Sequence, residues 1–205
     1  LTLVLSRPEK RNPHSHDHML RLRDRLRAAG GDAGVRAVVL GAVGPAFSAG
    51  HDLRELAEAD EALHRRVFDA CADLMTTVHR IPQPVIARVQ GIAAAAGCQL
   101  VAACDLAVAS EEARFSTPGV RIGLFCTTPM VELARSVGRK RAMELLLTGE
   151  PIDAATAAAW GLVNRVVPAD RLDAATADLA ARDAAASRLT LGIGKRAFWE
   201  NVDLP

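Results

Sequence analysis

The sequence predicts an α/β fold in which parallel strands alternate with helices along the chain. Short apolar segments at 1–5, 35–40 and 85–89 have the length and composition of buried strands. An amphipathic helix is predicted at 17–29, between the first two of these strands. Loops of small residues separate strands from helices further along, and this alternation is typical of βαβ units and a parallel sheet.

The other elements are predicted from the same apolar periodicity and from residues that end helices. Gly30 and Gly31 are expected to end the first helix, and Pro82 to stop a long helix that breaks near Ala59. Asp153 is the predicted N-cap of a later helix. Further strands are predicted at 106–109, 114–116 and 163–167, and further helices at 53–79, 98–103, 128–137, 139–147, 153–160, 171–186 and 189–205.

The composition excludes several classes of protein. The 205 residues, half of them hydrophobic, suffice for one sizeable domain. With 25 basic and 24 acidic residues the net charge is +1, so no nucleic-acid partner is expected. The uncharged run between Arg88 and Asp105 is too short to cross a membrane. The chain starts inside a strand pattern without Met, so residues upstream are expected to be missing.

The four cysteines show neither a metal-binding nor a redox spacing. Cys71, Cys98, Cys104 and Cys126 form no C-x-x-C pair, and Cys98 and Cys104 have small apolar neighbours. We therefore expect buried reduced thiols, and the absence of a visible signal peptide favours a cytoplasmic protein. A second interpretation makes Cys98 a thiolate that the start of a helix stabilises.

Three histidines alternate near the N-terminus, at His14, His16 and His18. This spacing permits metal binding. The preferred interpretation is a polar loop that runs into the start of a helix. The sequence predicts no metal and no permanently bound cofactor.

The segment from Ala93 to Gly97 is the first candidate functional feature. It follows the strand at 85–89 and has almost no side chains, so a ligand can approach its backbone. The first N–H groups of the next helix lack intrahelical acceptors. Such donors suit the negative charge that develops on a carbonyl oxygen, as in an oxyanion hole. The alternative is an alanine-rich buried helix packed against a sheet.

A second loop of small residues, from Gly44 to Leu53, also follows a predicted buried strand and precedes a helix. Together the two loops can offer two backbone N–H donors to one carbonyl, which is acyl-group chemistry without a side-chain requirement. A catalytic triad is not expected here, because Ser48, His51 and Asp52 lie too close together on one loop.

Several motifs occur in a fixed order along nearly the whole chain. They include Ser6-Arg7-Pro8-Glu9-Lys10-Arg11-Asn12, Phe47-Ser48-Ala49-Gly50-His51-Asp52-Leu53, the segment 91–105, Phe115-Ser116-Thr117-Pro118 and Trp160-Gly161-Leu162-Val163. In this order and spacing they resemble the crotonase family, the enoyl-CoA hydratase/isomerase superfamily. The segments 51–53 and 118–126 are most similar to a mitochondrial branch of that family.

The resemblance implies a spiral of ββα units with a helical C-terminal region. Members of the family assemble as trimers or as dimers of trimers. In this sequence, residues 1–168 would form the spiral core, and 169–205 the start of an incomplete helical trimerisation region. The implied partner is a small-molecule acyl-CoA, with the coenzyme A thioester as substrate or ligand.

The resemblance also implies the positions of the site residues. It places the two oxyanion donors on the backbone N–H groups of His51 and Ala96, with a catalytic imidazole at His51 as the lesser alternative. Cys126 is expected to line the acyl pocket. The residues expected along the coenzyme A are Lys10, Pro13, Ala49, Asp52 and Leu53.

The sequence departs from the family at two catalytic positions. Where hydratases of this family carry two glutamates, this chain has Gln99 and Gly119. An amide can hold a water but cannot take its proton, and glycine has no side chain. General acid–base groups contribute roughly 10²–10⁴-fold each, so efficient hydration is not expected.

We therefore expect an enoyl-CoA hydratase/isomerase-like protein that binds an acyl-CoA thioester between two backbone N–H groups. Its proton shuttle would be non-standard or absent. Two alternatives remain open: a non-catalytic acyl-CoA-binding or regulatory protein, and a thioester hydrolase or decarboxylase of the same fold. A ClpP-like peptidase is disfavoured because no serine and histidine pair is available.

Overall fold

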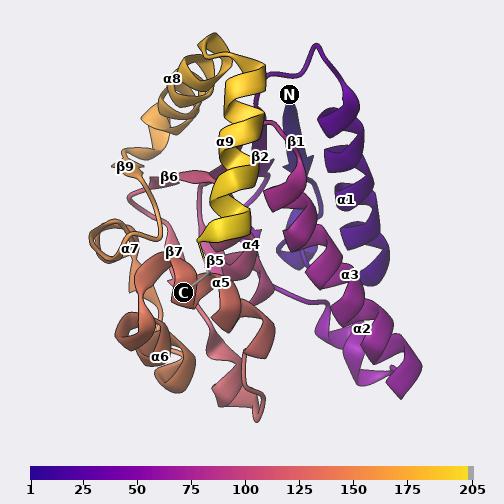
Figure 1. Ribbon diagram of the computed structural model, residues 1–205. Coiled ribbons are helices and arrows are strands. Elements are labelled where there is room, and N and C mark those ends of the chain that lie inside the picture. Colours follow the sequence, from indigo (N-terminus) through magenta and orange to yellow (C-terminus); the bar gives the residue numbers. More distant parts are fainter. Residues whose placement is uncertain (203–205) are drawn as a thin grey trace.

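The structure is a computed structural model, and it describes residues 1–202. Its strands form two sheets (Figure 1). The first sheet is entirely parallel, in the order β1 (Thr2–Leu5), β2 (Val38–Ala42), β4 (Val85–Val89), β6 (Leu106–Ser110) and β9 (Arg165–Val167). The second contains β3 (Ala46–Ser48), β5 (Ile92–Ala94), β7 (Arg114–Ser116) and β8 (Ile152–Asp153), and its last pair is antiparallel.

The chain passes repeatedly from the first sheet to the second and then into helices. Thus β2 leads to β3 and the helices α2 and α3, β4 leads to β5 and α4, and β6 leads to β7 and α5. This is the ββα spiral that the resemblance implies. The predicted parallel α/β architecture is confirmed, apart from the one antiparallel pair.

The helices agree with the predicted ones in number and order. They are α1 (His16–Gly31), α2 (Leu53–Ala57), α3 (Glu61–Arg80), α4 (Ala96–Ala103), α5 (Thr127–Val137), α6 (Arg139–Thr148), α7 (Ala154–Trp160), α8 (Leu172–Ala185) and α9 (Arg188–Asn201). The break near Ala59 is confirmed, since Asp60 caps α3 through Leu63 N–H. Asp153 caps α7, as predicted.

Some predictions about the elements were wrong. Helix α1 ends at Gly31, as the glycine pair predicts, but it extends beyond the predicted end at residue 29, and Asp32 is its C-cap. The short strands β3, β5 and β8 were missed, because two or three residues are too few to show an apolar alternation. Of the predicted last helix, residues 203–205 lie outside the described part. The division of the chain at residue 168 stays a prediction.

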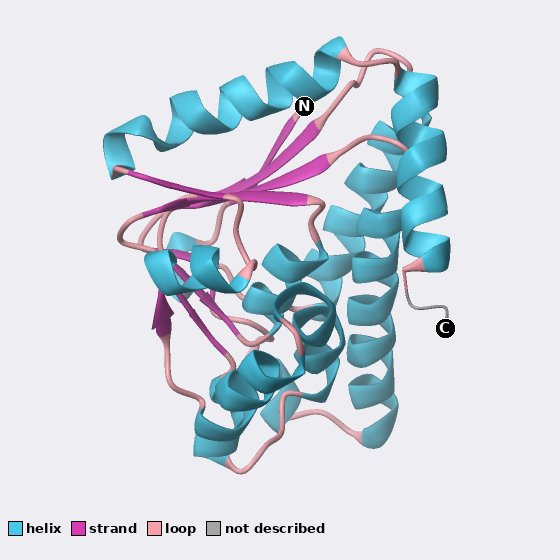
Figure 2. Ribbon diagram, turned by 60° about the vertical axis from the view of Figure 1, so that its left-hand side comes forward, coloured by secondary structure: helices cyan, strands magenta, loops and turns pink. Residues whose placement is uncertain are grey.

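Helices cover the five-stranded sheet on both faces (Figure 2). On one face, α8 packs against β2, β4 and β6, and Leu172 and Leu179 bury themselves against Ile86 and Val108. The main core lies on the other face, where α1 and α3 pack together and α9 contacts α3. In the described residues, no helix is both long enough and apolar enough to span a membrane.

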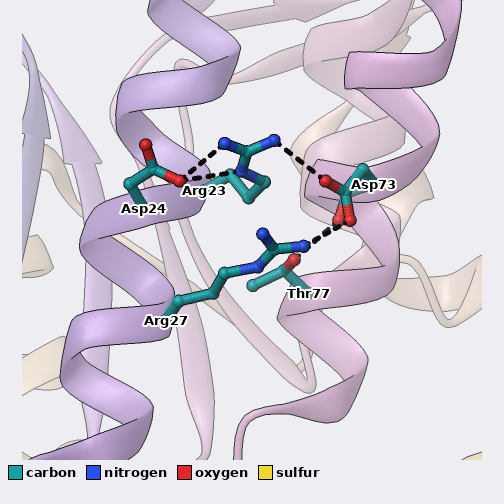
Figure 3. A network of polar contacts seen from close by, with 5 residues as sticks. All are labelled: Arg23, Asp24, Arg27, Asp73 and Thr77. Atoms are coloured by element: carbon teal, nitrogen blue, oxygen red, sulfur yellow. Dashed lines mark hydrogen bonds and ion pairs between the residues drawn. The ribbon is translucent and has the colours of Figure 1, made fainter.

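Charged side chains also join α1 to α3 at the surface (Figure 3). Asp73 of α3 accepts from Arg23 at 3.0 Å and from Arg27 at 2.7 Å. Thr77 donates to the backbone oxygen of Asp73 at 2.7 Å. Exposed pairs of this kind each contribute about 1 kcal/mol or less. The buried face of α3 therefore holds the helix in place, and the ion pairs add to it.

Candidate active site

The loop after β3 carries the first predicted oxyanion donor. The loop before α1 forms backbone hydrogen bonds with the residues on both sides of His51. His14 N–H donates to Gly50 O at 2.7 Å, and Asp52 N–H donates to His14 O at 3.2 Å. Gly50 has φ +94°, a conformation that favours glycine. Between these two bonds, the N–H of His51 has no acceptor within the described residues.

The turn from β5 into α4 carries the second predicted donor. Ala95 has φ +50° and ψ −120°, and its N–H donates to Ser116 O at 2.9 Å. This turn makes Ala96 the first residue of α4, so its N–H lies at the positive end of the helix. Within residues 1–202 this N–H also has no acceptor.

Two glycines show how closely these loops approach each other. A Cβ at Gly50 would lie 3.2 Å from the backbone nitrogen of Ala96 and 2.8 Å from the Cβ of Ala95. A Cβ at Gly97 would lie only 2.3 Å from Ser48 O. Since neither glycine can carry a side chain without displacing the other loop, the two free N–H groups are held beside each other.

Both donors border one cavity of about 290 Å³. Its wall is mainly apolar and comes from the two loops, from α2 and α3, and from the segment between β7 and α5. The residues that line it are Ala49, His51, Leu53, Leu56, Phe68, Ala95, Ala96, Pro118, Gly119, Arg121, Ile122, Leu124, Phe125, Cys126, Thr127, Thr128 and Pro129. A cavity of this shape suits an apolar group attached to a carbonyl.

The structure brings six of the sequence-predicted site residues together at this cavity. They are His51, Ala96, Gly119, Ala49, Leu53 and Cys126. Phe68, Leu56 and the segment 121–125 also form the wall, and the sequence analysis missed them. Phe68 lies on an exposed face of α3, and no periodicity distinguishes such a residue from other surface positions.

Gly119 lies against Cys126. A Cβ at Gly119 would be 2.8 Å from Cys126 Sγ and 2.9 Å from Leu124 O. The thiol thus occupies the space into which a side chain at position 119 would extend. Burial raises the pKa of Cys126, so its thiol is protonated at neutral pH.

Gln99 does not reach the cavity. It is 4% exposed, and its Oε1 accepts from the Cys71 thiol of α3 at 3.6 Å. The sequence predicts a position for this amide at which it could hold a water for the reaction. The hydrogen bond between Gln99 and Cys71 instead joins α4 to α3, because both of these side chains are buried where the two helices are in contact.

The other predicted contacts with coenzyme A lie away from the cavity wall. Lys10 ends an exposed 3₁₀ turn, Pro8–Lys10, and Pro13 is buried. Asp52 caps α2 by accepting from Arg54 N–H at 3.2 Å. Their binding role stays a prediction.

The predicted buried, reduced thiols are confirmed, because all four cysteines are free and buried. Burial raises the pKa of Cys98 to about 12, which excludes a thiolate there. The predicted loop that runs into a helix start is confirmed, since α1 begins at His16 after the N-cap Ser15, but His14 itself is buried. No group of three or more potential ligand residues that could hold a metal occurs in the described part of the chain.

Comparisons with known proteins agree with this geometry. The family model described as "Enoyl-CoA hydratase/isomerase" matches residues 1–205. The enoyl-CoA hydratase domain-containing protein 3, mitochondrial, of Danio rerio is 46% identical over 96% of this chain and 68% of its own length. The 2,3-dehydroadipyl-CoA hydratase of Escherichia coli is 35% identical over 100% of this chain and 80% of its own.

Solved structures of related proteins are also similar to this chain. The enoyl-CoA hydratase of Mycobacterium smegmatis has a TM-score of 0.97 and 46% identity, covering 100% of this chain and 80% of that one. The human enoyl-CoA hydratase domain-containing protein 3 has a TM-score of 0.96 and 44% identity, covering 100% and 81%. These findings confirm the predicted fold and branch, and the chain belongs to the enoyl-CoA hydratase/isomerase, or crotonase, family.

Proposed function

We propose that this protein binds an acyl-CoA thioester with the carbonyl oxygen between the N–H groups of His51 and Ala96, and that it stabilises the thioester enolate. One observation carries the proposal: two unpaired backbone donors border one apolar cavity. Donors fixed in a site that excludes water stabilise a developing oxyanion far more than donors in water do. The family membership supports coenzyme A as the carrier of the acyl group.

The proposed reaction differs from ordinary hydration. Gln99 lies outside the cavity and Gly119 has no side chain, so neither family position supplies a carboxylate. With both acid–base groups lost, turnover of crotonyl-CoA should be at most about one-hundredth that of an ordinary hydratase. Hydration at an ordinary rate would contradict this part of the proposal.

Binding can be tested without changing the protein. Isothermal titration calorimetry would compare butyryl-CoA with its thioether analogue, which lacks only the carbonyl oxygen. Two hydrogen bonds of about 1 kcal/mol each predict roughly thirtyfold weaker binding of the thioether. Equal affinity for the two ligands would show that the carbonyl is not held.

A non-catalytic acyl-CoA-binding protein is the second candidate. The contact between Gly119 and Cys126 favours it, because this contact closes the space where a catalytic side chain would act. Binding without turnover of any thioester in a panel of enoyl-, acyl- and malonyl-CoA would support it. Product from one of these thioesters would instead favour an enzyme, including a hydrolase or decarboxylase.

We propose a homotrimer or a dimer of trimers as the assembly, on the strength of the family resemblance. Light scattering coupled to size-exclusion chromatography would measure the number of subunits. A cytoplasmic location rests on the sequence alone, whereas the names of several relatives say mitochondrial. Cell fractionation with both compartments sampled would decide between these locations.

A further inference from the structure

We propose that the imidazole of His51 is the base that removes the α-proton of the bound thioester. This inference rests on the proposed function, since it requires an acyl-CoA in the cavity. It gives the side chain of His51 a task separate from that of its backbone, which holds the carbonyl oxygen. It also supplies a proton acceptor that positions 99 and 119 do not.

Geometry is the first argument. The imidazole belongs to the residue whose N–H is one of the two free donors, and His51 lines the cavity. An imidazole reaches only a few ångströms from its own backbone nitrogen. A thioester oxygen on that N–H therefore brings its α-carbon, two bonds away, close to the ring. The ring packs edge-on to Phe68 at a centroid distance of 5.3 Å, which restricts its orientation.

Elimination is the second argument. Among the described residues that line the cavity, the ionisable ones are His51, Arg121 and Cys126. Arg121 is a permanent cation and pairs with Glu150, so it accepts no proton. Cys126 keeps its proton at neutral pH, because burial raises its pKa. His51 is thus the one residue of this lining that can accept a proton at pH 7.

The hydrogen-bonding state of His51 is the third argument. His18 and His64 each use a ring nitrogen to bond a backbone oxygen, Pro13 O and Leu56 O, at 2.9 Å. The buried Nε2 of His51 has no such partner in residues 1–202. A buried polar atom left unpaired in a native fold requires an explanation. Nδ1 is not among the buried unpaired atoms and has no hydrogen bond within residues 1–202, so it is the ring nitrogen that a ligand and solvent reach.

The proton affinity of His51 suits this task. Burial lowers its pKa to about 4, so the ring is neutral at pH 7 and has the basicity of an ordinary glutamate. The titratable groups around it are His14 on the preceding loop and Cys126 and Arg121 across the cavity. His14 is itself buried and uncharged at neutral pH, and Phe68 of α3 covers the ring without charge.

The step is a simple proton transfer. The α-carbon–hydrogen bond breaks, the proton moves to a ring nitrogen of His51, and the electron pair is delocalised onto the carbonyl oxygen. The N–H groups of His51 and Ala96 hold the resulting enolate oxygen. The imidazolium exchanges its proton with solvent and returns a solvent proton to the α-carbon, so no other reactant is needed.

The test is the exchange of α-protons of butyryl-CoA for deuterium in D₂O, followed by NMR, alongside measurement of binding. The variant His51→Gln keeps the backbone N–H and changes only the side chain. We expect butyryl-CoA binding within about threefold of wild type and exchange at least about a hundredfold slower, as for loss of a general base. The matched control is His16→Gln, a histidine away from the cavity, for which exchange should be unchanged.

The outcomes separate this inference from the proposed function. Absence of butyryl-CoA binding by the wild-type protein would contradict both. Binding without exchange, or equal exchange in His51→Gln, would overturn the base and leave the binding function intact. Exchange that survives His51→Gln but is lost in Cys126→Ser would assign the base to the thiol instead.

The pH dependence gives a second readout. A neutral His51 predicts an exchange rate that is constant between about pH 6 and 8 and falls on acidification through about pH 4. A Cys126 base predicts a rate that rises about tenfold per pH unit over the same range, because only its minor thiolate form reacts. A rising profile would therefore contradict the assignment to His51.

Discussion

At the scale of single residues, the oxyanion turn depends on a backbone conformation that an alanine side chain disfavours. Ala95 has φ +50° and ψ −120°, a region that glycine occupies far more easily. Relief of about 1–3 kcal/mol of strain should exceed the added chain entropy of glycine, about 0.4–1 kcal/mol. We predict that Ala95→Gly raises the free energy of unfolding by about 1 kcal/mol, as measured by urea denaturation.

A matched control lies one residue earlier. Ala94 is in the regular strand β5, so Ala94→Gly should lower the free energy of unfolding. If Ala95→Gly lowered the free energy of unfolding as much as Ala94→Gly does, the proposed backbone strain at Ala95 would be contradicted.

A second prediction concerns Gly119. The variant Gly119→Glu would place Cβ against Cys126 Sγ and Leu124 O, so overpacking should lower stability by about 1–3 kcal/mol. The same contact should prevent the new carboxylate from restoring crotonyl-CoA hydration. Gly194→Glu is the control, because nothing lies within 4 Å of a Cβ there. Restored hydration in Gly119→Glu would show that the segment with Leu124 and Cys126 moves to accommodate the new side chain.

Part of this residue-scale detail is predictable from the sequence. The small residues of 93–97 and the glycine of the His51 loop predict two backbone donors, because side chains are missing where a ligand must approach. The direction of Gln99 and the contact of Gly119 with Cys126 were not predictable. The direction of Gln99 depends on its contact with Cys71 of α3, 28 positions away in the sequence. The contact of Gly119 depends on the path of the loop that carries Cys126.

At the scale of elements, α4 connects the site to the C-terminal helix. Its first residue is the donor Ala96, and Asp105 lies just beyond its C-terminal end. Asp105 accepts from Val85 N–H at 2.8 Å, from Lys195 Nζ at 2.6 Å and from Trp199 Nε1 at 3.2 Å. One carboxylate therefore fixes α4, β4 and α9 together.

This arrangement predicts that substitutions of Asp105 and of Lys195 lower the free energy of unfolding by different amounts. Asp105→Ala leaves the ammonium of Lys195, whose side chain is 9% exposed, without its counter-charge, and should lower the free energy of unfolding by about 3–5 kcal/mol. Lys195→Met leaves the Asp105 carboxylate unpaired instead, but this group is 17% exposed and keeps the N–H donors of Val85 and Trp199, so the variant should cost clearly less. Urea denaturation of both variants measures the difference. Equal losses would contradict the compensation of the Asp105 charge by the donors of Val85 and Trp199.

The helices were the most predictable elements, and the shortest strands the least. The long helices carry several turns of apolar periodicity and clear caps, such as Asp60 and Asp153. By contrast β3 and β5 have three residues each and pair with strands distant in sequence. Three residues are too few to show which side chains face the core, so only the assembled spiral specifies these strands.

At the scale of the whole molecule, the buried histidines make folding sensitive to acid. Burial lowers the pKa of His14 to about 3, whereas in the unfolded chain it is near 6.5. Below about pH 6.5, His14 binds a proton in the unfolded chain but not in the folded protein. The free energy of unfolding therefore falls as the pH decreases toward 3. The full contribution of His14 is present only above about pH 6.5.

The variant His14→Leu tests this linkage. Between about pH 4 and 6 it should reduce the slope of unfolding free energy against pH by up to about 1.4 kcal/mol per unit. His16→Leu, at a partly exposed position, is the control and should leave the slope unchanged. An unchanged slope in His14→Leu would mean that His14 titrates normally in the folded state.

The fold as a whole serves to bring two backbone N–H groups, 45 positions apart in the sequence, to one carbonyl oxygen. The most direct test is the carbonyl carbon resonance of [1-¹³C]butyryl-CoA, recorded by NMR free and bound to the protein. Two donors that polarise the carbonyl predict a downfield shift of this resonance on binding. A bound ligand whose carbonyl resonance remains at its position in water would contradict the oxyanion hole at His51 and Ala96.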